Sequence, residues 1–264
     1  MKTPSPFSIW MRDNLKDAYS GLITQDIDFI IKKPDSHFLI AEEKLLSSAR
    51  TGPAQAVIYK LLNDILANDS NFQGCHKVTC DGEKLFINQS HTRSLHDFLD
   101  DPFHNYLNSY NQTWFEKIIF FNKRFLWDCQ GTPYTKKTEI EHSYQRESKL
   151  MPLLEKYSIE YTSIDWIFLN YCTGYFALFY EGNFEEKVNG DNTIKSIINN
   201  FESYNKSDKK AYNPKSNSEY HFLGAYQLQY TENFSHFFIN EHRITVDDAI
   251  RVLNLDSNEI IKFK

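Results

Sequence analysis

Two short apolar runs that carry acidic residues constrain the fold of this chain most. Residues 25–31 (QDIDFII) and residues 38–44 (FLIAEEK) both read as strands, and residues 33–36 (KPDS) between them are typical of a turn. The three segments together predict a β-hairpin. Alternate residues of a strand share a face, so Glu42 and Lys44 should point the same way.

The predicted hairpin should bring three charged side chains to one end of an apolar sheet. Asp28 lies on the first strand, and Glu42 and Lys44 lie on the second. Buried charge is costly unless it is paired or holds a metal ion, so this arrangement predicts a functional site. The alternative is an exposed hairpin with an ordinary Glu–Lys pair, which would stabilise the fold very little. The apolar neighbours on both strands favour the buried interpretation.

The pattern of Asp28 followed by Glu42-x-Lys44 resembles the PD-(D/E)xK nuclease superfamily. In that pattern an aspartate on one strand of a hairpin is followed by Glu-x-Lys on the next strand. The resemblance covers residues 10–88, and Ile27 stands where the family usually has a proline. It implies an α/β (α+β) restriction-endonuclease-like fold, with a mixed sheet flanked by helices. It also implies hydrolysis of DNA phosphodiester bonds with Mg²⁺, for which Mn²⁺ can substitute.

The resemblance assigns roles to four residues. Asp28 and Glu42 are the expected metal ligands, and the Ala41 carbonyl can add a third oxygen. Mg²⁺ prefers such hard oxygen ligands and completes its shell with water and phosphate oxygens. Lys44 is expected to hold the attacking water or a phosphate oxygen as a point charge.

Three further residues are secondary candidates for the same site. Asp26 shares the strand face of Asp28 and could assist it. Glu43 competes with Glu42 for the metal, although it should face the other side of the strand. Gln55, at the start of the next helix, matches a polar position that some superfamily members use, but a helix-surface role is the commoner one.

Helices and a second hairpin are predicted around this site. Residues 8–19 have helical periodicity, with Ser8 as a plausible N-cap and Gly21 as a plausible stop. Pro53 suits the first turn of a second helix. Residues 75–88 predict another hairpin around an Asp-Gly turn.

The same order of elements recurs later in the chain. Residues 164–169 (IDWIFL) parallel residues 27–31, and residues 174–181 (GYFALFYE) parallel residues 36–43 (SHFLIAEE). We therefore predict an internal duplication of one α/β unit. The alternative is that any two α/β hairpins look alike when reduced to hydrophobic letters.

The duplication divides the chain into three predicted parts. Residues 1–100 form the nuclease-like domain, residues 101–149 form a helical connector, and residues 150–264 form a degenerate nuclease-like repeat. Within the last part, residues 203–218 are polar and rich in lysine and asparagine, and they predict a mobile loop with a local basic surface.

The second copy departs from the nuclease pattern. Asp165 aligns with Asp28 and Glu181 falls near Glu42 or Glu43, but Gly182 and Asn183 stand where a lysine is needed. The Glu-x-Lys of residues 185–187 lies beyond the strand. We therefore expect this half to be catalytically inert.

Composition limits the possible partners and location. The net charge of −6 gives no global attraction to DNA, so a local basic surface must supply it. The four cysteines form no C-x-x-C pair and indicate reduced thiols of a cytoplasmic protein. No apolar run approaches membrane-spanning length, and the N-terminus has no signal-peptide core.

The leading hypothesis is a metal-dependent DNA endonuclease. A nuclease that cuts both strands needs two active centres, so the chain would nick DNA, form a homodimer or act with a partner protein. The alternative, supported by the net acidity and the degenerate second copy, is a non-catalytic nucleic-acid- or protein-binding module that keeps the fold.

Overall fold

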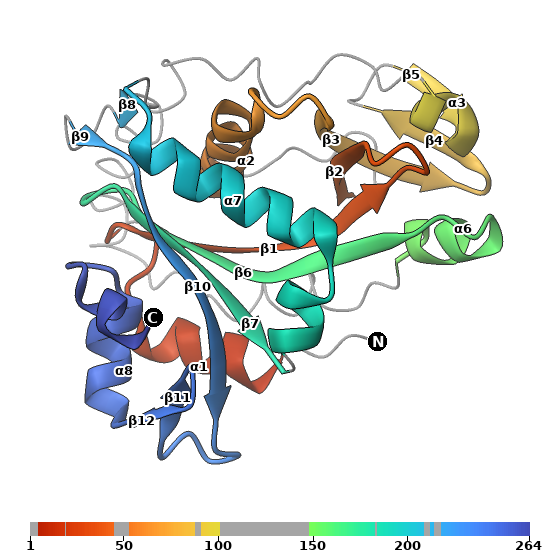
Figure 1. The fold of residues 1–264 in the computed structure, drawn as a ribbon. Coiled ribbons are helices and arrows are strands. Elements are labelled where there is room, and N and C mark those ends of the chain that lie inside the picture. The colour runs from red at the N-terminus through yellow and green to blue at the C-terminus, as the bar shows by residue number, and fades with distance from the viewer. Residues whose placement is uncertain are drawn as a thin grey trace, which may run out of the picture.

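One mixed β-sheet with helices on both faces forms the framework of the protein (Figure 1). In the computed structural model, the residues described are 5–18, 20–44, 53–87, 91–100, 148–182, 184–208, 212–213 and 218–264. The predicted helical connector lies outside these ranges, apart from its last two residues. Ten strands form the sheet, in the order β12-β11-β10-β7-β6-β1-β2-β3-β4-β5. The structure thus confirms the predicted class, a mixed α/β sheet flanked by helices.

The first half of the chain supplies five strands and three helices of this framework. They are α1 (Pro6–Asn14), β1 (Leu22–Lys32), β2 (Phe38–Glu43), α2 (Pro53–Leu66), β3 (Phe72–Asp81), β4 (Lys84–Ile87), β5 (His91–Ser94) and α3 (Leu95–Asp100).

The second half supplies the other five strands, a separate two-stranded ribbon and the remaining helices. They are α6 (Leu150–Lys156), β6 (Tyr161–Asn170), β7 (Tyr175–Glu181), the π-helix η2 (Glu185–Asn189), α7 (Asn192–Lys206), β8 (Tyr212–Asn213), β9 (Ser218–Glu219), β10 (His221–Tyr230), β11 (Phe237–Ile239), β12 (His242–Ile244), α8 (Val246–Leu253) and the 3₁₀ helix η3 (Glu259–Phe263).

The two halves of the sheet have the same connectivity. In the first, β1 and β2 form an antiparallel hairpin, and α2 carries the chain across to β3, which pairs parallel to β2. In the second, β6 and β7 form the hairpin, and α7 leads to β10, which pairs parallel to β7. Two short antiparallel strands complete each half. The halves meet at the centre, where β1 pairs antiparallel with β6.

Local backbone features recur at matching positions of the two halves. Gly74 on β3 and Gly224 on β10 have φ angles of 95° and 139°. Each lies at a register shift of the parallel pair that its strand makes. The φ angle of Gly224 lies in the region that favours glycine, and a Cβ atom there would also approach the Tyr226 hydroxyl to 3.0 Å.

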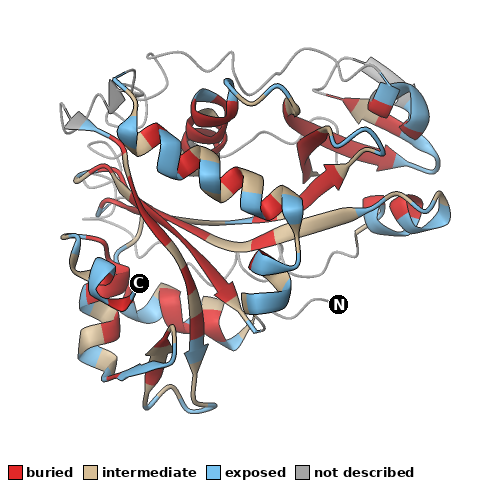
Figure 2. Ribbon diagram, in the orientation of Figure 1, coloured by how far each residue is buried: buried red, intermediate tan, exposed pale blue. Residues whose placement is uncertain are grey.

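Helices cover both faces of the sheet and enclose three apolar clusters. On one face, α2 and α7 pack over alternate residues of the central strands, such as Ile30 and Leu178 (Figure 1). On the opposite face, α1 and α8 cover the second half, and α3 and α6 cover the first half, where Ile31 is buried. The buried residues accordingly follow the central strands and the inner sides of the helices in Figure 2.

The sequence-based boundaries of two segments need correction. The first helix begins and ends earlier than predicted, at Pro6 and Asn14. The Ser5 hydroxyl, not that of Ser8, caps it by accepting from the Ser8 N–H at 3.1 Å. The segment 203–218 is not one loop, since α7 continues to Lys206.

Of the four cysteines, Cys129 lies outside the described residues. The other three are free thiols, as predicted.

The helices within the described ranges include none that is both long enough and apolar enough to cross a membrane.

Candidate active site at the end of the first hairpin

The register of the first hairpin places the predicted site residues at neighbouring positions. Phe29 on β1 pairs with Ala41 on β2, and one step further along the same register lie Asp28 and Glu42. Ala41 is fully buried and packs on the face of α3 and α6. Glu42 follows it on the opposite face, towards α2. Lys44 comes directly after the end of β2.

Glu42 is the centre of a hydrogen-bonded cluster. Its Oε1 accepts from Lys44 Nζ at 2.8 Å and from Gln55 Nε2 at 2.6 Å, and its Oε2 accepts from the Tyr59 hydroxyl at 2.5 Å. Lys44 Nζ also donates to Gln55 Oε1 at 2.9 Å. The prediction that Glu42 and Lys44 lie on one side of the chain is therefore confirmed. The helix-surface interpretation of Gln55 is wrong, because its amide bridges both residues.

Burial distinguishes this cluster from an exposed ion pair. Glu42 is only 5% exposed, and the Lys44 side chain is 22% exposed. The exposed-hairpin alternative is therefore wrong. Burial raises the pKa of the Tyr59 phenol well above its usual range, and the negative charge of Glu42 adds to this effect. Tyr59 thus stays protonated and remains a donor to Glu42.

β1 is irregular at the predicted metal ligand. Ile27 and Ile30 both pack in the cluster under α2, although residues three apart on a regular strand face opposite sides. The pairing of β1 with β6 shifts register on both sides of Ile27. Simple alternation therefore does not fix the relation between Asp26 and Asp28. Asp28 is half-buried, whereas Asp26 is exposed and accepts a hydrogen bond from its neighbour Gln25.

Glu43 is held on the other side of the sheet, as predicted. Its carboxylate accepts from the Ser148 hydroxyl at 2.6 Å and from the backbone N–H groups of Lys149 and Leu150 at 2.8 and 3.0 Å. These bonds satisfy free N–H groups at the start of α6. Glu43 therefore anchors a helix and does not belong to the Glu42 cluster.

Two residues beside Glu42 were not among the candidates predicted from the sequence. Tyr59 lies four residues after Gln55 on α2, the spacing that puts two helical side chains on one face. This spacing could have identified Tyr59 as a neighbour of the site from the sequence. Lys77 pairs with Glu42 across the parallel strands β2 and β3, and no local pattern marks it.

The second half carries a different cluster at the matching place. Trp166 pairs with Phe179, so Tyr180 occupies the position of Glu42, and Glu181 occupies that of Glu43. Asp165 accepts from Lys187 Nζ at 2.5 and 2.6 Å and from the Glu181 N–H at 2.8 Å. The Glu-x-Lys of residues 185–187 therefore supplies a lysine to Asp165 from η2, beyond the strand.

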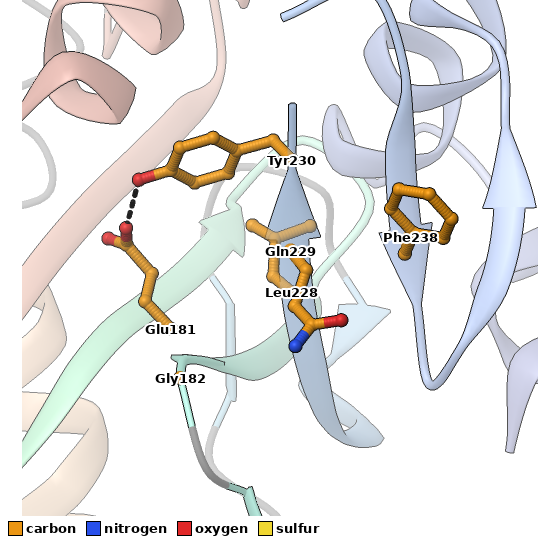
Figure 3. A pocket seen from close by; sticks show the side chains of 6 residues that line it. All are labelled: Glu181, Gly182, Leu228, Gln229, Tyr230 and Phe238. Carbon is orange, nitrogen blue, oxygen red and sulfur yellow. Dashed lines mark hydrogen bonds between the residues drawn. The ribbon is translucent and has the colours of Figure 1, made fainter. Parts of the chain in front are cut away.

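An open surface pocket of about 410 Å³ lies in the second half, at the ends of β7 and β10 (Figure 3). None of the predicted site residues lines it. Tyr230 donates a hydrogen bond to the Glu181 carboxylate there, as Figure 3 shows, and Trp166 Nε1 donates to the same carboxylate at 2.6 Å. Both carboxylate oxygens of Glu181 thus have a donor.

Metal binding at the Glu42 cluster would depend on few protein ligands. The described ranges contain no group of three or more His, Cys, Asp or Glu side chains that could hold an ion. The ligands predicted from the sequence are the carboxylates of Asp28 and Glu42 and the Ala41 carbonyl, and Mg²⁺ commonly binds to one or two carboxylates with water and phosphate filling the other positions. These predicted oxygen donors are of the kind that suits Mg²⁺ and not a thiolate-seeking metal.

Fold and site define a mixed α/β protein with a buried, lysine-paired glutamate at the end of a hairpin. No family model matches the sequence, and no solved structure matches it either. The chain is 35% identical over 133 residues to an uncharacterized protein of Archaeoglobus fulgidus, and the match covers 47% of this chain and 90% of that protein. A second uncharacterized protein of the same organism is 34% identical over 143 residues, which are 48% of this chain and 93% of its own length. The chain belongs to the same family as these two proteins.

Proposed function

We propose that the protein is a metal-dependent DNA endonuclease of PD-(D/E)xK type, with its active centre in the first half. The observation that carries the proposal is the 5% exposure of Glu42, whose carboxylate meets Lys44 and Gln55 at the end of an apolar strand. A buried carboxylate with an ammonium partner is costly to place there, and such groups concentrate at functional sites.

In this mechanism Asp28, Glu42 and the Ala41 carbonyl would hold Mg²⁺ or Mn²⁺. When bound, the metal lowers the pKa of a coordinated water and neutralises charge on the phosphate. Tyr59 and Gln55 fix both oxygens of Glu42, which keeps the carboxylate in one orientation. Lys44 would hold the attacking water or a phosphate oxygen, and its bond to Gln55 keeps the ammonium beside Glu42.

We further propose that the chain arose by duplication of a restriction-endonuclease-like unit whose second copy is inert. The matching connectivity of the two halves supports this, as do the paired glycines at Gly74 and Gly224. The A. fulgidus relatives align along nearly their whole length with about half of this chain. The second copy has Tyr180 and Gly182 where the first has Glu42 and Lys44, so it lacks the metal-binding glutamate and its lysine.

A chain with one active centre should nick duplex DNA. Cutting both strands at once would need self-association or a partner protein. Supercoiled plasmid distinguishes these modes, because nicking gives the open-circular form and paired cutting gives the linear form.

Cleavage assays with matched variants test the proposal. Supercoiled and linear DNA are incubated with Mg²⁺ or Mn²⁺ and then with EDTA, using the wild type, Asp28→Asn and Lys44→Ala. We expect metal-dependent cleavage in the wild type and its loss in both variants, with circular dichroism spectra unchanged. Salt-sensitive DNA binding without cleavage would instead support the non-catalytic module, and cleavage that survives in both variants would place the active centre elsewhere.

A further inference from the structure

A second lysine lies beside Glu42 on the next strand. Lys77 of β3 is the direct partner of Glu42 of β2 in the parallel pair. Cys75 packs in the cluster under α2, whereas Val78 and Cys80 pack on the opposite face. By strand alternation Lys77 shares the face of Cys75, which is also the face of Glu42.

Burial of a lysine at this position carries a desolvation cost. Lys77 is only 1% exposed. Burial lowers the pKa of its ammonium, and the positive charge of Lys44 lowers it further. The Lys44 N–H donates to the Val78 carbonyl at 2.8 Å, so Lys44 lies beside the strand that carries Lys77. Lysine is rarely this buried in proteins unless its charge has a use or a partner.

The fold itself does not require a lysine at this position. In the second half, Tyr180 pairs with Gln227 just as Glu42 pairs with Lys77. The Gln227 amide donates to the Gly182 carbonyl at 2.6 Å, so a neutral side chain satisfies the matching position. The charged lysine is therefore present only in the half that also has Glu42 and Lys44.

We propose that Lys77 is a second phosphate-binding residue, which together with Lys44 binds the oxygens of a DNA phosphodiester beside Glu42. This inference rests on the proposed function and names how the same site holds its substrate. Two ammonium point charges suit a phosphate with two non-bridging oxygens. Lys44 is the more exposed of the two, so an incoming phosphate meets it first.

The competing explanation is that Lys77 only offsets the buried charge of Glu42. In that case its removal would destabilise the fold and leave DNA affinity unchanged. DNA affinity measured without metal separates the two explanations, because only the phosphate-binding role predicts a change in affinity. This measurement does not require cleavage.

The test uses Lys77→Gln, which copies the residue of the second half, and Lys84→Gln as a matched control on the exposed surface of β4. Binding of a fluorescein-labelled DNA duplex is followed by anisotropy in EDTA over a range of NaCl concentrations. We expect Lys77→Gln to bind roughly tenfold more weakly than wild type. The slope of log K against log[NaCl] should fall in magnitude by roughly 0.9, the value for one lost phosphate contact. Lys77→Arg should keep the slope.

Equal affinity and slope for Lys77→Gln and wild type would overturn the inference, as would an equal loss in Lys84→Gln. Should Lys77→Gln fail to fold, the wild type labelled with ¹⁵N-lysine is titrated with a thymidine dinucleotide in EDTA. A shift of the Lys77 ammonium resonance, assigned with Lys77→Arg, supports the site, and no shift at saturation overturns it.

Failure of the proposed function is distinguishable from failure of this inference. If DNA binding depends on Lys77 but no cleavage occurs in Mg²⁺, the endonuclease proposal is rejected and the phosphate site is supported. If cleavage occurs but Lys77→Gln has no effect on binding, the endonuclease is supported and the phosphate site is rejected. A wild type that binds no duplex would overturn both.

Discussion

The Tyr59 hydroxyl on α2 donates a 2.5 Å hydrogen bond to the Glu42 carboxylate on β2. The bond fastens the crossover helix to the strand that precedes it. Because both residues are buried, water competes little for this hydrogen bond. The polar cluster is therefore part of the core as well as a candidate site.

Removing the Tyr59 hydroxyl should destabilise the fold. Tyr59→Phe leaves Glu42 Oε2 without this donor in a buried setting, and a lost hydrogen bond to a buried charged group costs about 1–3 kcal/mol. The free energy of unfolding in urea measures the change. Tyr180→Phe is the matched control, since the Tyr180 hydroxyl is buried and has no hydrogen-bond partner within the described structure. An equal effect of the two substitutions would contradict the role given to Tyr59.

Gln55 should matter for cleavage more than for stability. Gln55→Ala removes the amide that bridges Lys44 and Glu42, while α2 keeps a good helix former at that position. Loss of such a supporting contact typically reduces metal affinity or activity by roughly 10–100-fold. Plasmid nicking rates at saturating Mg²⁺ provide the measurement, with the exposed Gln229→Ala as control. Identical rates in the two variants would show that the bridge has no catalytic role.

The second half should tolerate changes that abolish activity in the first. Asp165→Asn removes the ion pair with Lys187, whose side chain is 38% exposed while that of Asp165 is 17% exposed, so we expect a loss of only about 1 kcal/mol of stability. Cleavage should be unchanged, in contrast to Asp28→Asn. Parallel urea titrations and nicking assays of the two variants test this. Loss of cleavage in a folded Asp165→Asn would mean that the second centre is active.

Asp191 should give the protein a measurable sensitivity to acid. Burial acts to raise the pKa of this carboxyl, but Lys32 and the N–H groups of Thr193 and Ile194 together lower it below the ordinary value of 3.8. A lowered pKa in the folded state adds stability at neutral pH, and this is lost as the pH falls below 3.8 through the folded value.

The matched substitution is Asp191→Asn, which keeps an N-cap for α7 but removes the charge. Its free energy of unfolding should lie about 1 kcal/mol below that of wild type at pH 7. The difference should shrink as the pH falls below 3.8. A difference that is constant with pH would exclude the ionic contribution.

Local patterns predicted much of the fold, and pairing across the sheet decided the rest. The first hairpin, the helix opening at Pro53 and the Asp81-Gly82 turn follow from local sequence, and the structure has them all. Lys77 could not be found this way, because its place beside Glu42 depends on the parallel pairing of β2 with β3 after the α2 crossover.

Two further differences have the same origin. The face of Asp28 could not be read by alternation, since the irregular pairing of β1 with β6 interrupts it. The partner of Asp165 could not be read either, because Lys187 reaches it from η2 and not from the strand position that matches Lys44.

The antiparallel join of β1 and β6 places the first strand of each half in the interior of the sheet. An isolated half would leave that strand as an open border, with a row of unused N–H and C=O groups able to recruit any neighbouring chain. Because both halves lie on one polypeptide, β6 can pair with the open edge of β1 within the same chain. The effective local concentration of the two edges then does not depend on how much protein the cell makes.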